Sequence, residues 1–372
     1  MKLFADFAPV SEAQWIQQVE KDLKGKSFDS LFRTLDESIV LKPFYARNAV
    51  TSEGIIAKEG GGDWEICEII VVDTDIKAAN QRAIAALMSG ANALTFKLFR
   101  QFEVKDLSVL LQDIELSYIC THFECDKIEQ DFAAQLLQAF FDVATQHKNN
   151  PATLRGSIFV TPILGNYEVE MASMVRYAQA NLPLFRTITV DVSRFQTGGE
   201  GIVQELTEIL VQAKQLFDSM LKLGIDAEVI PNVMQFSVAL DMDYFTQIAK
   251  IRALRLLWAN VLNAYGVSSL FPTIIEARTN PNSYDANDHN TNKIRMTTIA
   301  MSAVLGGADR IVLSPTQETD TVFANRIALN VQHILKMESY FDGVADPAAG
   351  SYYIETLTEA LAQEVWTSFV NI

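Results

Sequence analysis

Between residues 61 and 340 the sequence alternates eight times between a short β-rich run and a longer segment with helical periodicity. The β-rich runs lie at 64–72, 93–98, 117–123, 156–164, 187–192, 229–238, 273–277 and 310–314. The helical segments that follow them lie at 76–89, 104–114, 128–145, 168–180, 202–223, 244–265, 293–305 and 323–337. Eight strand–helix units in strict alternation predict an α/β fold, a (β/α)8 TIM barrel rather than a doubly wound sheet.

Residues 1–60 fall outside this alternation. Ser11 and Gln14 have the spacing of a helical capping box, and apolar residues beginning at Trp15 follow at helical intervals. A glycine-rich break at 59–63 separates this stretch from the first strand. We therefore predict three parts, namely an N-terminal helical and extended arm over 1–60, the barrel over 61–340, and a C-terminal loop and helix over 341–372.

Charge and cysteine content exclude several classes of protein. The 46 acidic and 30 basic side chains give a net charge of −16, which repels nucleic acid. Nowhere do about 18 apolar residues run unbroken, so no membrane span is expected. The three cysteines are too few and odd in number for a disulfide framework, which favours the reducing cytoplasm.

The chemistry of a β/α barrel gathers where its strands end. Polar residues at those positions include Lys97, His122, Asp191, Glu276 and Arg278. Arg194 also follows a strand and precedes two glycines, which allow a ligand to approach closely. The alternative for Arg194 is an ion pair that closes the loop, and the sequence alone leaves both readings open.

Two other clusters have structural explanations. Cys120, His122 and Cys125 are zinc-ligand types, but no nearby fourth ligand completes a site, so the prediction is that no metal is bound. The basic residues of the segment 250–255 are expected on a solvated helix face, with a protein interface as the alternative. No motif of a serine hydrolase, zinc protease or P-loop is present. The residues alone therefore predict an acidic barrel without a convincing catalytic set.

Four segments resemble the cobalamin-dependent methylmalonyl-CoA mutase family. They are 248–259 (IAKIRALRLLWA), 277–279 (ART), 303–308 (AVLGGA) and 346–355 (DPAAGSYYIE). The last is the most specific, since it is close to the family signature Asp-Pro-x-Gly-Gly-Ser-Tyr-Tyr-Val-Glu. The opening residues, 7–25 and then 42–45, look like the start of the small (beta) subunit. The resemblance spans nearly the whole chain.

The resemblance implies a barrel that carries a coenzyme A ester, followed in the family by a domain that binds adenosylcobalamin through an Asp-x-His-x-x-Gly loop. This sequence has no such loop, so we expect it not to bind the cofactor by itself. The implied partner is a large (alpha) catalytic subunit, which interconverts (R)-methylmalonyl-CoA and succinyl-CoA by a radical 1,2-shift. The arm over 1–60 would then contact that subunit.

Departures from the family fall on its chemistry. The catalytic segment Gly-Tyr-His-Met-Gln corresponds to 192–196, where Ser193 replaces tyrosine, Arg194 replaces histidine and only Gln196 matches. The substrate-contacting stretch after the fourth strand reads Phe-Val-Thr-Pro-Ile-Leu at 159–164, without polar and basic residues of the family. These departures imply a non-catalytic small subunit in which Gln196 and Arg278 are the candidates for any remaining substrate contact.

Two alternatives remain at this point. One is an active substrate subunit of another acyl-CoA mutase, paired with a separate cobalamin-binding chain. Arg194 argues against it, because the histidine it replaces would be the donor near the thioester. The other is a free-standing acyl-CoA-binding or scaffold barrel.

Overall fold

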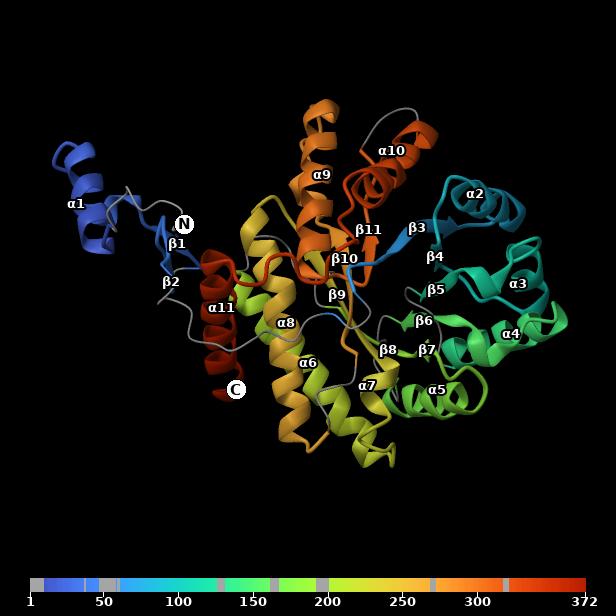
Figure 1. Ribbon diagram of the computed structural model, residues 1–372. Helices are drawn as coiled ribbons and strands as arrows, with labels where there is room; N and C mark the ends of the chain where they lie inside the picture. Colours follow the sequence, from blue (N-terminus) through green and yellow to red (C-terminus); the bar gives the residue numbers. More distant parts are fainter. Residues whose placement is uncertain are drawn as a thin grey trace, which may run out of the picture.

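Nine strands of the described chain pair in parallel into one sheet (Figure 1). The computed structural model describes residues 10–36, 38–46, 58, 61–125, 131–160, 167–191, 201–267, 272–316 and 321–372. The strands are β3 (Glu65–Val72), β4 (Ala93–Leu98), β5 (Cys120–Cys125), β6 (Arg155–Val160), β7 (Phe185–Arg186), β8 (Ile188–Asp191), β9 (Met234–Leu240), β10 (Ile274–Thr279) and β11 (Arg310–Val312). Their order is β7-β6-β5-β4-β3-β11-β10-β9-β8.

The two ends of this order belong to one run of chain. Only Thr187 separates β7 from β8, and its amide donates to the carbonyl of Val233 at 3.0 Å instead of continuing either ladder. Because β7 pairs with β6 and β8 pairs with β9, the sheet closes on itself. Counted as one strand position, β7 and β8 complete eight, and the predicted TIM barrel is confirmed.

Helices follow the strands and cover the outside of the barrel (Figure 1). They are α2 (Ile76–Met88), α3 (Val104–Leu110), α4 (Phe132–Gln146), α5 (Tyr167–Asn181), α6 (Ile202–Lys222), α8 (Tyr244–Ala264), α9 (His289–Gly306) and α10 (Thr321–His333), the last continuing as a π-helical turn over Ile334–Glu338. Each lies close to the segment expected from helical periodicity.

The sixth predicted strand, 229–238, was wrong in its first half. Residues Ile230–Val233 form the short helix α7, and the strand β9 begins only at Met234. Pro231 has no amide hydrogen for a ladder but fits the first turn of a helix. The third predicted strand, 117–123, is shifted in the same way, because Leu116–Tyr118 form a 3-10 turn and β5 begins at Cys120.

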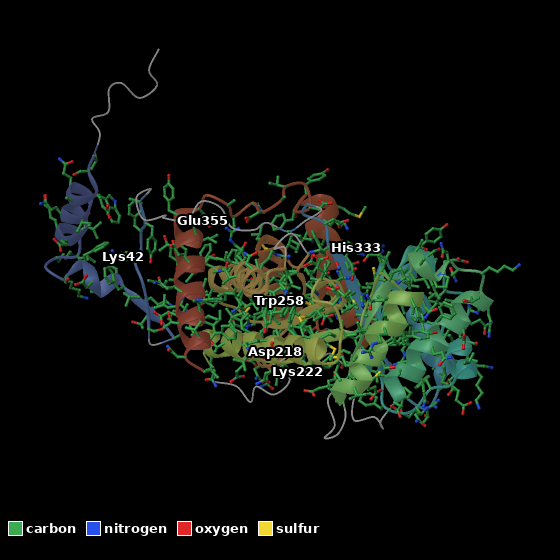
Figure 2. The ribbon with its side chains drawn as sticks, turned by 90° about the horizontal axis from the view of Figure 1, so that it is seen from below. Lys42, Asp218, Lys222, Trp258, His333 and Glu355 are labelled. Atoms are coloured by element: carbon green, nitrogen blue, oxygen red, sulfur yellow. The ribbon has the colours of Figure 1, made fainter. Side chains whose placement is uncertain are left out.

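The apolar core lies between the strands and the surrounding helices. The rings of Phe96, Phe123, Phe140 and Phe185 contact one another in sequence, with centroids 5.4–6.0 Å apart. On the far side Trp258 of α8 packs on Phe236 of β9 and lies deep within the molecule (Figure 2). Burial of each such ring stabilises the fold by about 1.5–3 kcal/mol. The outward-pointing residues of the strands thus form the core, and the inward-pointing residues are left for the barrel interior.

The N-terminal arm has an anchored and an unanchored half. The capping box of Ser11 and Gln14 begins α1 (Glu12–Asp22) as predicted, yet no residue of this helix is buried. It is joined by a 3-10 turn (Phe28–Leu31) to the antiparallel pair β1 (Arg33–Leu35) and β2 (Ile39–Leu41). Ile39 and Leu41 are buried, and Arg33 forms an ion pair with Asp243 at the start of α8. Helix α1 itself lies apart from the barrel (Figures 1 and 2).

The C-terminal helix α11 (Tyr352–Val370) packs along α8 and α6. Leu357, Leu361 and Val365 are buried at helical spacing in that interface. This helix lies within the C-terminal loop and helix predicted over 341–372. Among the described residues no helix is both long and apolar enough to span a bilayer.

Candidate functional site

The interior of the barrel is lined by charged side chains that pair with one another. Inward-pointing positions of neighbouring strands meet in register, for example Glu276 of β10 opposite Arg310 of β11 and Lys97 of β4 opposite Glu124 of β5. Because strand residues alternate between faces, a charged residue at every second position produces a polar stack inside the barrel. We define the axial network as Lys97, Glu124, Arg278, Glu276 and Arg310.

Ion pairs join the axial network from one end of the barrel to the other. At the C-terminal end Lys97 Nζ lies 3.0 Å from Glu124 Oε1, and Arg278 Nη1 lies 2.9 Å from Glu124 Oε2. Nε of Arg278 and Nε of Arg310 both donate to the Glu276 carboxylate. Ser237 Oγ donates to the same carboxylate at 3.1 Å. The charges therefore alternate in sign along the barrel.

Burial and pairing fix the protonation of these groups. The side chains of Glu124 and Glu276 are 1% and 2% exposed. Burial by itself raises the pKa of Glu276, but the attraction of Arg278 and Arg310 lowers it well below its usual range. Likewise burial lowers the pKa of Arg278, and the two glutamates more than reverse this. Glu276, Arg278 and Arg310 therefore stay charged, and none of these three groups is poised to exchange a proton near neutral pH.

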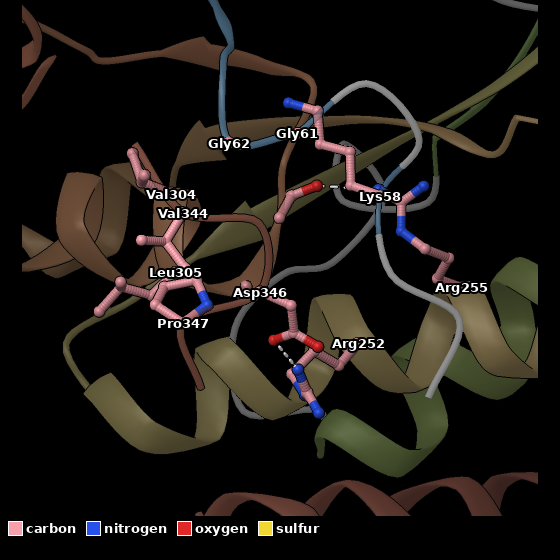
Figure 3. Close-up of a pocket in the computed structure, with 12 residues that line it drawn as sticks. Lys58, Gly61, Gly62, Arg252, Arg255, Val304, Leu305, Val344, Asp346 and Pro347 are labelled. Carbon is pink, nitrogen blue, oxygen red and sulfur yellow. Dashed lines mark hydrogen bonds and ion pairs between the residues drawn. The ribbon is translucent and has the colours of Figure 1, made fainter. Parts of the chain in front are cut away.

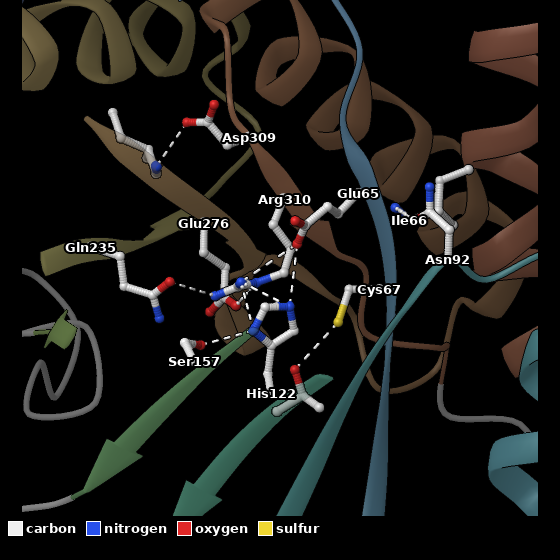
Figure 4. A network of polar contacts seen from close by, with 12 residues as sticks. Glu65, Ile66, Cys67, Asn92, His122, Ser157, Gln235, Glu276, Asp309 and Arg310 are labelled. Carbon is white, nitrogen blue, oxygen red and sulfur yellow. Dashed lines mark hydrogen bonds and ion pairs between the residues drawn. The ribbon is translucent and has the colours of Figure 1, made fainter. Parts of the chain in front are cut away.

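A second polar group, around His122, contacts Arg310 of the axial network (Figure 4). The Nδ1 of His122 is 2.8 Å from Ser157 Oγ, and its Nε2 is 3.2 Å from Glu65 Oε2. Arg310 Nη1 lies 3.0 Å from both ring nitrogens. Burial and the charge of Arg310 lower the pKa of His122, which favours the neutral imidazole. Burial would raise the pKa of Glu65, but His122 and Arg310 lower it to about 2.

Only part of the cysteine–histidine cluster considered from the sequence comes together. Cys120 and His122 share the inner face of β5, and Glu65 joins them with its ligand atoms within 4.8 Å of theirs. Cys125 points to the opposite face, into the apolar core. The guanidinium of Arg310 contacts His122 and lies 3.6 Å from Glu65, so a metal ion there would sit beside a fixed positive charge. Burial raises the pKa of Cys67 to about 12 and that of Cys120 further, so neither thiol is a ready nucleophile.

The expectation of a solvated basic face on 250–255 was wrong. Lys250, Arg252 and Arg255 are 2–4% exposed. Each has an acidic partner far away in the sequence: Glu205 for Lys250, Asp346 and Glu355 for Arg252, and Asp309 for Arg255. Helix α8 is buried on nearly every side because α6, α9 and α11 pack around it, so its cations face partners rather than water.

These pairs explain part of the 346–355 signature in physical terms. Its first and last residues, Asp346 and Glu355, both bind Arg252 of α8. Figure 3 shows the pair of Asp346 with Arg252. The cavity beside them measures about 20 Å³, too small for a ligand beyond a single water. The signature thus fastens the C-terminal loop and α11 to α8.

The site residues expected from the sequence have different outcomes. Ser193, Arg194 and Gln196 lie outside the described residues, as does the 161–164 stretch, so their roles stay predictions. Arg278 is described, and its side chain is 19% exposed at the C-terminal end of the axial network. A substrate contact by Arg278 stays a prediction, to which the structure adds the ion pairs. Sequence reasoning missed Glu65 and Arg310, because both lie at the start of their strands and a barrel site is expected at the C-terminal strand ends.

The sequence of the chain is similar to known proteins of one family. Residues 102–372 match the family model described as methylmalonyl-CoA mutase. The methylmalonyl-CoA mutase small subunit of Porphyromonas gingivalis is 32% identical, over 100% of this chain and 64% of the relative. That of Streptomyces virginiae is 27% identical, over 100% of this chain and 65% of the relative. A methylmalonyl-CoA mutase of Cereibacter sphaeroides is 27% identical, over 95% of this chain and 57% of the relative. The chain thus spans less than two thirds of the length of these relatives.

Proposed function

The chain belongs to the methylmalonyl-CoA mutase family, and from this membership we propose that it is the small, non-catalytic subunit of a heterodimeric, adenosylcobalamin-dependent mutase. Its partner is the large (alpha) subunit, which carries the isomerisation of (R)-methylmalonyl-CoA and succinyl-CoA. We place the complex in the cytoplasm. The observation that carries the proposal is the axial network, whose charged groups neutralise one another where a catalytic barrel would need free donors.

The residues present do not fit the cobalt-binding loop of the family. None of the four histidines has an aspartate two residues before it. The buried imidazole of His122 is held by Ser157, Glu65 and Arg310 inside the barrel. We therefore assign adenosylcobalamin to the complex and not to this chain alone. An absorption titration of the 372-residue chain with the cofactor should show no saturable change.

The arm supplies the proposed contact with the large subunit. In α1 Trp15 is 36% exposed. Its ring contacts the rings of Phe28 and Phe44, both in the arm, with centroids 5.9 and 4.7 Å away. Phe44 is itself 44% exposed. An aromatic cluster that stands apart from the barrel is a surface for another chain.

The experiment is to purify the chain with its cognate large subunit and to measure both assembly and turnover. We expect a one-to-one complex by analytical ultracentrifugation and no turnover by this chain alone. Lys97→Gln should leave the turnover number of the complex within about twofold, because a side chain outside the chemistry contributes little to the transition state. A loss of a hundredfold or more would instead support an active substrate barrel, and failure to associate would support a free-standing protein.

Arg194 gives a second test of the non-catalytic role. An always-charged guanidinium cannot replace an imidazole in proton exchange near neutral pH. Arg194→His alone should not create activity, since Ser193 also departs from the family. Measurable turnover by this variant with a cobalamin-binding chain added would contradict the proposal.

A further inference from the structure

A pocket of about 220 Å³ opens at the N-terminal end of the barrel, opposite the end where barrel enzymes act. The first residues of several strands line it, among them Glu65, Arg155, Arg186 and Arg310. Its inner wall is formed by His122, Gln235 and Arg310, the group shown in Figure 4. A ligand that enters from this end therefore meets the axial network and goes no deeper.

The cations around this pocket differ in whether they are paired. Arg310 is matched by Glu276 and Glu65, and its Nη2 donates to Gln235 Oε1 at 3.3 Å. The side chains of Arg155 and Arg186, by contrast, form no ion pair or hydrogen bond with any residue of the described chain. Two unpaired guanidinium groups at one pocket are unexpected in a chain of net charge −16.

Arg186 is the more informative of the two. Its Nε is buried and has no hydrogen-bond partner among the residues that the structure describes. A buried donor on a charged group is costly unless something accepts its hydrogen bond. The nearby acids do not provide that acceptor, since the Asp309 carboxylate is bound by Arg255 and by the amide of Ile275 at 2.8 Å. Glu65 is bound by His122.

We propose that this pocket binds a phosphate group between Arg155 and Arg186, as inorganic phosphate or as a phosphate monoester. A phosphate dianion matches the charge of the two unpaired guanidinium groups, whereas a carboxylate carries only one negative charge. The guanidinium fork offers the parallel donors that phosphate oxygens accept. The remainder of a monoester would leave the pocket past Leu184, which is 47% exposed.

Isothermal titration of the full chain in phosphate-free buffer tests the proposal with two probes, inorganic phosphate and phenyl phosphate. Saturable submillimolar binding of at least one probe is expected. Tighter binding of inorganic phosphate would identify free phosphate as the ligand, and tighter binding of phenyl phosphate would identify a monoester. Arg186→Met should weaken binding by roughly tenfold or more, since it removes a charge-assisted pair. The control is Arg326→Met, which removes one exposed positive charge on α10 and should bind like the wild type.

Stability without ligand separates binding from a structural role. Because Arg186 Nε has no partner in the described part of the chain, Arg186→Met should not lower the thermal midpoint in phosphate-free buffer and should lose only the rise that phosphate causes. If this variant does not fold, Arg155→Gln decides, since that side chain is exposed and its loss should weaken binding severalfold. The proposal is overturned if the wild type shows no saturable binding, or if the variant that folds binds as tightly as the wild type.

Discussion

At the scale of single residues, the acids on the strands of this barrel do not all behave alike. Glu276 is surrounded by two arginines, whereas Glu68 points out of the barrel toward α10, where Asn325 Nδ2 donates to it at 3.2 Å. Glu276 is held ionised by its neighbours, whereas no cation of the described residues offsets the burial of Glu68. Neutralising Glu276 and neutralising Glu68 should therefore have opposite effects on the free energy of unfolding.

Glu276→Gln should lower the free energy of unfolding by roughly 3–5 kcal/mol, because it leaves Arg278 and Arg310 buried with one partner fewer. Chemical denaturation at pH 7 measures the change. Glu20→Gln, at an exposed position of α1, is the control and should change stability by less than about 0.5 kcal/mol. A loss below about 1 kcal/mol for Glu276→Gln would mean that the ion pairs add little.

Burial raises the pKa of Glu68 to about 7, against the effect of its hydrogen bond with Asn325. Between about pH 4.3 and 7 the unfolded chain ionises this group while the folded chain keeps it protonated, so its contribution to stability falls as pH rises. Glu68→Gln should remove that dependence. We expect it to gain about 1–3 kcal/mol relative to the wild type at pH 8 but little at pH 4. If the free energies of unfolding of the wild type and of Glu68→Gln change with pH in the same way across this range, the raised pKa of Glu68 is contradicted.

Prediction from sequence worked less well for charged residues than for apolar ones. Glu276 and Arg278 could be placed near a site because they end a strand. The burial of Lys250, Arg252 and Arg255 could not be predicted, since their partners lie 45 or more positions away along the chain and only packing brings them together. A cation on a helix is usually solvated, and tertiary contacts reversed that expectation here.

At the scale of elements, the arm and the barrel meet at the start of α6. Asp36 accepts a hydrogen bond from the amide of Val203 at 2.6 Å, so it caps this helix from a distant part of the chain. Gly201 makes room for the contact, because a Cβ at this position would overlap the Asp36 carboxylate. The helix has no side-chain cap of its own.

Asp36→Ala should therefore lower the free energy of unfolding by about 1 kcal/mol, the usual cost of losing an N-cap. Gly201→Ala should cost at least as much, by displacing the same carboxylate. Thermal or chemical unfolding checks both, with the exposed Asp22→Asn in α1 as the control. If neither substitution lowers stability, the arm is not fastened to the barrel at this point.

Element type and order were predictable because helical and alternating periodicities differ and each recurs eight times. The boundaries of a strand were not predictable where a turn or a short helix lies directly beside it. In 229–238 an apolar run conceals a proline-initiated helix, and in 117–123 a 3-10 turn precedes the strand. The division of one strand position into β7 and β8 at Thr187 also has no signal in the sequence pattern.

At the scale of the whole molecule, the anchored and unanchored halves of the arm make separate contributions. Trp15→Ala should change the stability of the isolated chain by less than about 1 kcal/mol, because no residue of α1 is fully buried and the Trp15 ring packs on the arm residues Phe28 and Phe44, outside the barrel core. In the proposed complex, burying this ring is worth about 2 kcal/mol, so association should weaken about 30-fold. Analytical ultracentrifugation of the mixed chains gives the measurement, with Tyr118→Ala, 80% exposed on the barrel, as the control.

Deleting residues 1–30 should weaken association with the large subunit more than Trp15→Ala does, and it should leave a folded barrel. Association as tight as that of the intact chain would show that α1 takes no part in assembly. Unfolding of the shortened chain would show instead that the arm belongs to the core and that the boundary at residue 60 is misplaced.

The alternating charges inside the barrel also limit how such a sequence can drift. Lys97, Glu124, Arg278, Glu276 and Arg310 form a line in which each carboxylate serves two cations. Replacing Glu124 or Glu276, the two buried carboxylates, leaves two cations with one partner fewer, so a single substitution at either position should cost stability. Lasting changes would have to come in matched pairs, one of each sign, on strands that lie side by side. We therefore expect the buried charges inside the barrel to tolerate substitution only in matched pairs, whereas the helix-facing apolar positions accept single exchanges of similar volume.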